Sequence, residues 1–327
     1  MILIQPSSAV DIVTYTSGQD GKKQSKAHGE IIDYTGKSLT IVLAGDREQL
    51  IPTERVVEIK SAWTPQQTEG DKKYAEGKFD EALQQYEDSV RIEHRVWAKR
   101  LILSKHVWCL RATKKYELAA EKFLLIVGND STTQYFDCIP LAWKTQQPDA
   151  GFQRQAIKWL DAQDDAVTTL MGASWLLSTT HRPAALDALA QLGNDPDPRI
   201  AHLADAQRWR TEIVTAKPDE VGRWQKQIDR MPKSLRAGPH FIVAQALARQ
   251  GQHELSAMTF MRTAIFFPND RQLVAGSLHL AATELEQLGR TSEAVGLYRE
   301  VANVYADVAV AAEATGRLES LTKANDE

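Results

Sequence analysis

The first part of the chain alternates short runs of β-branched and aromatic residues with glycine-containing turns. Between Asp11 and Ile59 the runs are DIVTYTS, HGEIIDYTG, SLTIVLAG and EQLIPTERVVEIK. Short apolar runs separated by turn residues predict β-strands. The segment SGQDGKKQSKAHG is polar and rich in glycine, which is typical of a hairpin loop between the first two strands. We therefore expect residues 1–62 to form a small all-β module.

After Trp63 the spacing of apolar residues becomes helical and stays so to the end of the chain. Thr64 is a suitable N-cap for the first helix, and Pro65 fits its first turn. The pattern predicts that residues 63–327 form a continuous array of helices, because no linker-like run of Gly, Ser or Pro interrupts it.

The segment GDKKYAEGKFDEALQQYEDSVRIE resembles a tetratricopeptide repeat, in which small residues let two helices cross closely and aromatic rings fill the space between turns. Its matching residues are Gly70, Tyr74, Gly77, Phe79, Ala82, Tyr86 and Ser89. The scheme recurs through Tyr116, Ala119, Phe123 and Ile126, through Ala244, Gly251, Ser256, Phe260 and Pro268, and through Ala282, Gly289, Ala294 and Tyr298. The resemblance implies paired helices at 65–128 and 236–304, with irregular HEAT-like pairs at 132–232 and a cap helix at 307–323.

The β module resembles the small SH3-like or Sm-like modules of bacterial envelope and repeat proteins. The matching residues are Gly29, Ile31, Asp33, Ile51, Pro52, Val56 and Ile59. The expected fold class is therefore mostly α, an α-solenoid preceded by a small SH3-like barrel. The C-terminal run LYREVANVYADVAVAAEATGRLESL is similar to repeats of bacterial envelope-assembly proteins. This similarity favours the periplasm or cell envelope if the true start of the protein lies upstream, and the cytoplasm otherwise.

Composition and charge narrow the function classes. The chain is 43% hydrophobic and 25% charged, as expected of a protein that folds, and its net charge of -4 provides no overall attraction for nucleic acid or anionic lipid. No apolar run is long enough to span a membrane. Two cysteines are too few for a disulfide framework.

No catalytic motif is present. The sequence contains no GxxxxGK, GxSxG, HExxH, CxxC or GxGxxG, and its eight histidines never pair at i, i+4. We therefore expect no catalytic, metal or cofactor site and no enzymatic activity. One enzyme hypothesis stays open, with Cys138 as a nucleophile that would need a nearby base and a depressed pKa.

Two features suggest a partner site. In the segment QYFDCIPLAW, Pro140 prevents one regular helix, so that its aromatic residues either line a groove or belong to a buried kink. The second feature is a set of basic residues on the expected first helices of the opening repeats, which line the concave face in the tetratricopeptide family. We expect these charges to be exposed and to form a basic groove. The candidate partner-binding residues are Lys72, Lys73, Arg95, Lys99, Arg100, Lys105, Tyr135, Phe136 and Trp143.

The sequence thus predicts a non-catalytic scaffold that binds protein or peptide segments, with segments rich in Asp and Glu favoured by the basic groove. RNA binding is the alternative, because Sm-like barrels occur in RNA-handling proteins and Lys22, Lys23 and Lys26 crowd one loop. Against it, the β module as a whole is nearly neutral. The tryptophans of the helical region are expected to be mostly buried between helices.

Overall fold

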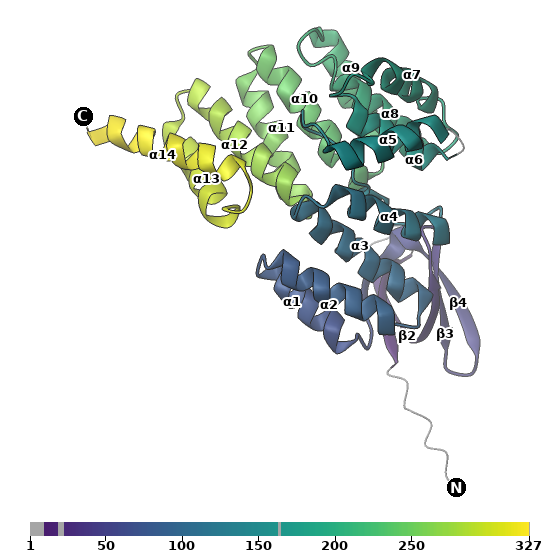
Figure 1. The fold of residues 1–327 in the computed structure, drawn as a ribbon. Coiled ribbons are helices and arrows are strands. Elements are labelled where there is room, and N and C mark those ends of the chain that lie inside the picture. The colour runs from purple at the N-terminus through teal and green to yellow at the C-terminus, as the bar shows by residue number, and fades with distance from the viewer. Residues whose placement is uncertain (1–9, 19–22, 163–164, 327) are drawn as a thin grey trace. The chain divides into compact units, whose positions relative to one another are not determined.

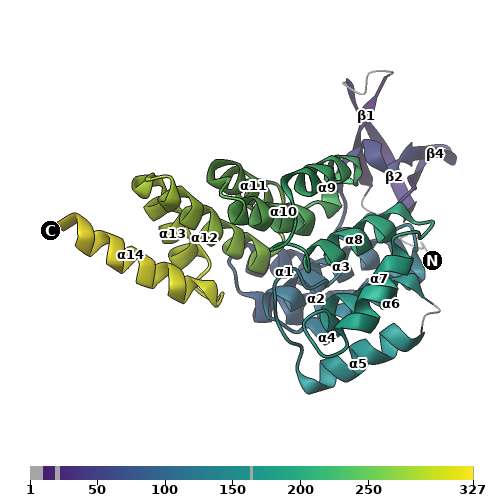
Figure 2. The same ribbon diagram turned by 90° about the horizontal axis from the view of Figure 1, so that it is seen from above.

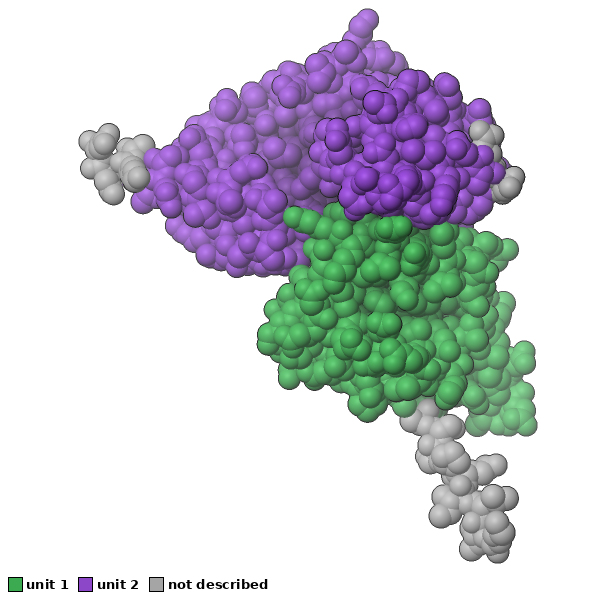
Figure 3. Space-filling view, in the orientation of Figure 1, with its two compact units in different colours: residues 1–140 green, residues 141–327 purple. Residues whose placement is uncertain are grey.

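A computed structural model describes residues 10–18, 23–162 and 165–326, and it gives side chains up to residue 322 (Figure 1). Residues 1–9 lie outside the described residues. So does Lys22, one of the lysines that the RNA-binding hypothesis used. By contacts between Cα atoms the chain divides into two compact units, residues 1–140 and 141–327 (Figure 3). The first unit contains the sheet and the first helices, and the helical array is divided between the two units.

The first unit begins with an antiparallel five-stranded sheet in the order β4-β3-β2-β1-β5. The strands are β1 (Asp11–Ser17), β2 (Lys23–Tyr34), β3 (Ser38–Leu43), β4 (Arg47–Pro52) and β5 (Val56–Lys60). A short 3-10 helix, η1 (Thr53–Arg55), precedes β5. In β3, for example, Leu39 and Ile41 are fully buried whereas Thr40 between them is only partly buried, which is the alternation expected of a strand with one face on a core.

Helices make up the remainder of both units. In the first unit they are α1 (Pro65–Ala75), α2 (Phe79–Ile92), α3 (Val96–Ala112), α4 (Tyr116–Asn129) and the 3-10 helix η2 (Phe136–Cys138). In the second unit they are α5 (Ala150–Ala162), α6 (Ala166–Leu176), α7 (Arg182–Leu192), α8 (Pro198–Trp209), α9 (Pro218–Arg230), η3 (Lys233–Leu235), α10 (Ala237–Arg249), α11 (His253–Phe266), α12 (Arg271–Gln287), α13 (Thr291–Val304) and α14 (Val310–Asp326). In Figures 1 and 2, α10 to α14 follow one another side by side. The fold class expected from the sequence, a mostly helical repeat preceded by a small β module, is confirmed.

The close helix crossings of the repeats depend on small residues. At Gly70 in α1, a Cβ atom would lie 2.8 Å from Cε1 of Tyr86 in α2. The rings expected between the helices are indeed buried there: Tyr86, Phe123, Phe260 and Tyr298 are all at most 1% exposed. Burial of such large rings is a principal source of stability in repeat proteins, because each repeat lacks a closed core of its own.

The sheet is attached to the helices by α3. Trp97 and Ala98 belong to the same buried cluster as Val13, Ile31 and Ile41 of the strands. The indole Nε1 of Trp97 donates to the carbonyl oxygen of Ile31 at 3.0 Å, so the only polar atom of this buried ring is paired. The sheet therefore completes its core with a helix residue.

The same turn is repeated between the two helices of each tetratricopeptide-like pair. Gly77, Gly251 and Gly289 have φ angles between 71° and 74°, and Lys114 occupies the equivalent position with φ 61°. In each turn the next residue donates its backbone N–H to a carbonyl five residues earlier, which is the Schellman closure of a helix. Lys114 is thus the one member of these four turns that lacks glycine.

We predict that Lys114→Gly raises the free energy of unfolding by about 1 kcal/mol, because the left-handed conformation is unfavourable for a side chain with a Cβ. The reciprocal change, Gly77→Lys, should lower it by a similar amount. Urea unfolding followed by tryptophan fluorescence measures both. A shift of the two midpoints in the same direction would contradict the assignment of strain to Lys114.

Candidate functional site

The expected basic groove of the first unit is not assembled by the structure. Arg100 is only 3% exposed, and its guanidinium pairs with Asp33 and donates to the carbonyl oxygen of Tyr34 at 2.9 Å. The expectation that Arg100 is an exposed charge is therefore wrong. The sequence could not show this, since Asp33 lies far away on β2 and only the fold brings it to α3.

Most of the other predicted cations are engaged within the unit. The ammonium group of Lys105 lies 2.7 Å from both carboxylate oxygens of Asp71 on α1. Lys73 pairs with Glu81 at 2.6 Å. These pairs neutralise the first-helix faces, and of the predicted lysines only Lys72 and Lys99 show no ion pair among the described residues.

Arg95 is also held by its own unit. Its Nε donates to Glu93 at 2.9 Å and its Nη2 to the carbonyl oxygen of Ala62. The guanidinium lies 5.5 Å and 5.2 Å from the ring centroids of Trp63 and Trp97, within cation–π range. Arg95 thus supports the junction between β5 and α3.

The segment QYFDCIPLAW is buried. In the first unit Phe136 is 2% exposed and stacks edge-on against Phe123 at 5.6 Å, while Arg111 donates to the carbonyl oxygens of Cys138 and Ile139. Tyr135 is partly buried, and burial raises its pKa above the ordinary range. Of the two interpretations that the sequence left open, a groove lining and a structural kink, this arrangement matches the kink.

In the second unit, residues 141–144 lie against the first helices of the C-terminal repeats. A Cβ atom at Gly238 in α10 would lie 1.9 Å from Cε2 of Trp143, so the indole occupies the space that the missing side chain leaves. Lys144 donates to the carbonyl oxygen of Gln272 in α12 at 2.8 Å, and its ammonium group lies 5.9 Å from the ring of Phe241. The carbonyl oxygen of Lys144 accepts from Arg210 at 3.0 Å. The chain itself therefore covers this part of the first-helix face.

The second helices of these repeats leave a different surface open. Large apolar side chains are exposed along α11, with Met258 exposed at 52% and Ile265 at 62%. We call the exposed residues of this helix the α11 face. They are Glu254, Leu255, Met258, Arg262, Ile265 and Phe266. An apolar surface that is continuous along a helix and rimmed by charges is typical of a protein interaction site.

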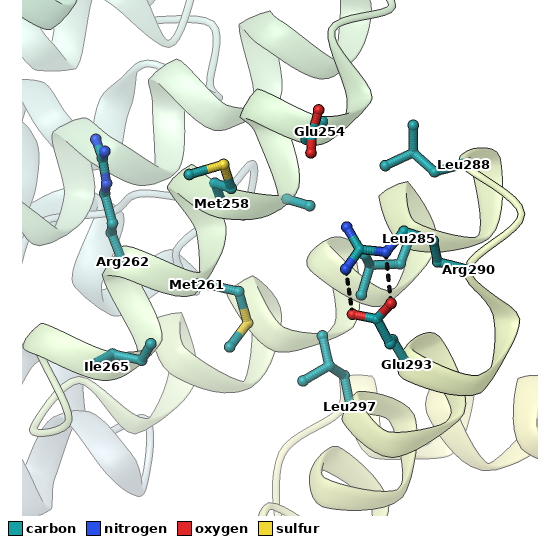
Figure 4. Close-up of a pocket in the computed structure, with 11 residues that line it drawn as sticks. Glu254, Met258, Met261, Arg262, Ile265, Leu285, Leu288, Arg290, Glu293 and Leu297 are labelled. Carbon is teal, nitrogen blue, oxygen red and sulfur yellow. Dashed lines mark hydrogen bonds and ion pairs between the residues drawn. The ribbon is translucent and has the colours of Figure 1, made fainter.

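A groove of about 400 Å³ lies beside the α11 face. Met261 of α11 and Leu297 of α13 line it from opposite sides, Leu285 lies at the end of α12 and Leu288 directly follows that helix (Figure 4). Arg290 and Glu293 form an ion pair at 2.6 Å at its edge. The groove thus combines an apolar lining with charged groups at its border, an arrangement that suits side chains of a protein partner.

The sequence contains a signal for the α11 face, although no motif marks it. The segment HELSAMTFMRTAIF has apolar residues on almost every side of the helix, rather than on one stripe. Phe260 and Ala257 fill the buried side, which leaves Leu255, Met258 and Ile265 without a place inside the repeat. An excess of apolar residues on a helix of known burial pattern could have predicted the surface.

Cys138 and two buried histidines have pKa values that do not suit catalysis at neutral pH. Cys138 is fully buried, and burial raises the pKa of its thiol well above the ordinary value, the opposite of what a nucleophile requires. Burial lowers the pKa of His106 and that of His240 to about 4. No group of three or more His, Cys, Asp or Glu side chains in the described part of the chain could hold a metal ion. Within the same part, every helix is too short or too polar to cross a membrane.

Lys23 and Lys26, from the RNA-binding hypothesis, are exposed on β2. The aromatic residue that β1 places near them, Tyr15 opposite Ser25, is partly buried. Stacking rings next to basic groups are what single-stranded nucleic acid usually requires.

Comparisons with known proteins add little to this description. No protein-family model matches the chain, and no curated protein matches it. Among solved structures, the chain is similar to the "TPR2AB-domain:pHSP90-complex of yeast Sti1", with 17% sequence identity and a TM-score of 0.32. The match covers 79% of this chain and 97% of that chain. At this TM-score the likeness carries no argument, and the repeat fold is established by the helices themselves.

A substitution at Gly238 tests whether the Trp143 indole covers α10. We predict that Gly238→Ala lowers the free energy of unfolding by about 3 kcal/mol, because the new Cβ would overlap the Trp143 indole. The matched control is Gly222→Ala in α9, where nothing lies within 4 Å of the added atom. That change should raise stability by up to about 1 kcal/mol through helix propensity. Equal effects of the two substitutions in urea unfolding would show that Trp143 does not pack against Gly238.

A pH dependence follows from His106. Because its folded-state pKa lies below the ordinary value, the unfolded chain binds the proton more readily, and stability decreases as the pH falls from about 6.5 to 4. We predict that His106→Leu removes about 3 kcal/mol of this acid sensitivity. The control is His94→Leu, at an exposed position of the same unit. Urea unfolding at pH 7 and pH 4 measures the difference, and a parallel acid response of both variants would contradict the prediction.

Proposed function

We propose that this protein is a non-catalytic interaction scaffold that binds other protein chains through its helical repeats. The observation that carries the proposal is the α11 face, where large apolar side chains stay exposed beside a groove. A single-chain protein gains nothing from such exposure, since each buried Å² of apolar surface is worth about 25 cal/mol. A partner that covers Met258 and Ile265 would recover this free energy.

We choose the face of the second helices because the protein's own chain covers the face of the first helices. In tetratricopeptide-like repeats the first helices are the usual place for a bound segment, but here Trp143 and Lys144 lie on α10 and α12. The second-helix face of the same repeats carries no such cover among the described residues. We therefore place the partner on α11 and α13 rather than on α10 and α12.

A second contact region is proposed on the first unit. Of the basic set expected from the sequence, Lys72 and Lys99 are the members that show no ion pair in the described chain. A partner segment rich in Asp and Glu would be held there by weak, salt-sensitive attraction.

The biological setting is proposed from the resemblances in the sequence. Assembly of a bacterial cell envelope is the setting that the C-terminal run favours for such a scaffold. The strand order of residues 1–62 supports an SH3-like or Sm-like module, placed ahead of the helical residues 63–327. In this arrangement the module contributes a structural platform for α3.

Site-specific photo-crosslinking tests the proposed function. With a benzophenone amino acid in place of Met258, we predict crosslinked protein adducts in the native cell, because the α11 face contacts a partner there. The control position is Val214, which is 77% exposed in the loop before α9 and lies outside the groove. Mass spectrometry of the adducts identifies the partner. Absence of adducts at position 258 would contradict the proposal.

A further inference from the structure

The charges of the α11 face form a self-complementary pattern. Glu254 and Arg262 lie about two helical turns apart, on the same side of α11, with Met258 midway between them. Neither Glu254 nor Arg262 has an ion pair within the described chain. The neighbouring Arg290 pairs with Glu293, which raises its pKa, and Glu254 adds a weaker attraction to the same guanidinium. An acidic group and a basic group are thus placed symmetrically about an exposed methionine.

We propose that this face binds a second copy of the same chain, with the two α11 helices packed antiparallel about a two-fold axis at Met258. The inference rests on the proposed function, since it names the partner of the same surface. In this arrangement Glu254 of one copy faces Arg262 of the other, and Arg262 faces Glu254. A two-fold contact is isologous, so that each pair occurs twice and the surface must be complementary to itself.

The apolar residues fit the same register. With Met258 opposite Met258 of the second copy, Leu255 comes opposite Met261, which lines the groove between α11 and α13. Met258 and Leu255 are exposed at 52% and 50%, so they can reach beyond the helix surface. Side chains of one helix then enter the groove of the other, as in ordinary helix packing.

Charge complementarity selects this partner over an unrelated apolar helix. A parallel arrangement of two copies would place Glu254 near Glu254 and Arg262 near Arg262, and both contacts would be repulsive. The antiparallel arrangement converts the same four charges into two attractive pairs. Rim pairs of this kind add little affinity but determine which orientation is allowed.

The test measures self-association by analytical ultracentrifugation of the purified full chain. We expect a reversible dimer for the unchanged chain. Glu254→Arg and Arg262→Glu should each weaken the dimer by about tenfold or more, because each variant confronts like charges twice. The control, Arg299→Glu, reverses an exposed charge of α13 outside the groove and should leave the dimer unchanged.

Mixing the two single variants provides the decisive measurement. Chains with Glu254→Arg carry two arginines on the face, and chains with Arg262→Glu carry two glutamates, so a mixture should form a heterodimer although neither variant associates with itself. Circular dichroism of each purified variant shows whether it folds. Recovery in the mixture supports the antiparallel contact, and weak association without recovery overturns it.

The two proposals fail in different ways. If the unchanged chain is a monomer at all concentrations and Met258 crosslinks only to other proteins, self-association is wrong and the interaction scaffold stands. If position 258 yields no adduct and the chain is monomeric, both are wrong. Adducts that contain two copies of this chain support self-association, and adducts that contain another protein support the interaction scaffold.

Discussion

The contact between Trp143 and Gly238 determines which surfaces of the second unit are available. The indole fits the space of a missing side chain so closely that a single methyl group would displace it. Lys144 continues the contact onto α12, and Arg210 donates to the carbonyl oxygen of Lys144. As a result, Trp143 and Lys144 pack against the first helices of the C-terminal repeats, and exposed apolar surface is found on α11 instead.

Much of the repeat fold could be predicted from residue types and their spacing. Gly70 and Tyr86 indicate a close crossing and a buried ring, because only a small residue permits such an approach, and Gly289 indicates a turn with positive φ. Lys114 shows the limit of the pattern, since the turn geometry is kept although the glycine is lost. Residue spacing therefore predicted the helical repeat, and the β-branched runs predicted the β module before it.

The candidate site could not be predicted to the same degree, because exposure depends on contacts between distant segments. Arg100 was expected at the surface, but Asp33 and Tyr34 of β2 surround its guanidinium. Lys105 and Asp71 belong to different helices, and their pairing removes a charge that the sequence counts as free. In the same way, the packing of Trp143 depends on Gly238, which lies far from it along the chain.

The position of Trp97 has a consequence for the order of events during synthesis. The strands leave the ribosome before α3, yet their buried cluster includes Trp97 and Ala98 of that helix. Until α3 has emerged, the sheet lacks part of its interior and the carbonyl group of Ile31 lacks its indole donor. The β module of the nascent chain therefore completes its core only after α3 has been synthesised. A chaperone that binds this protein during synthesis would first contact an incomplete sheet.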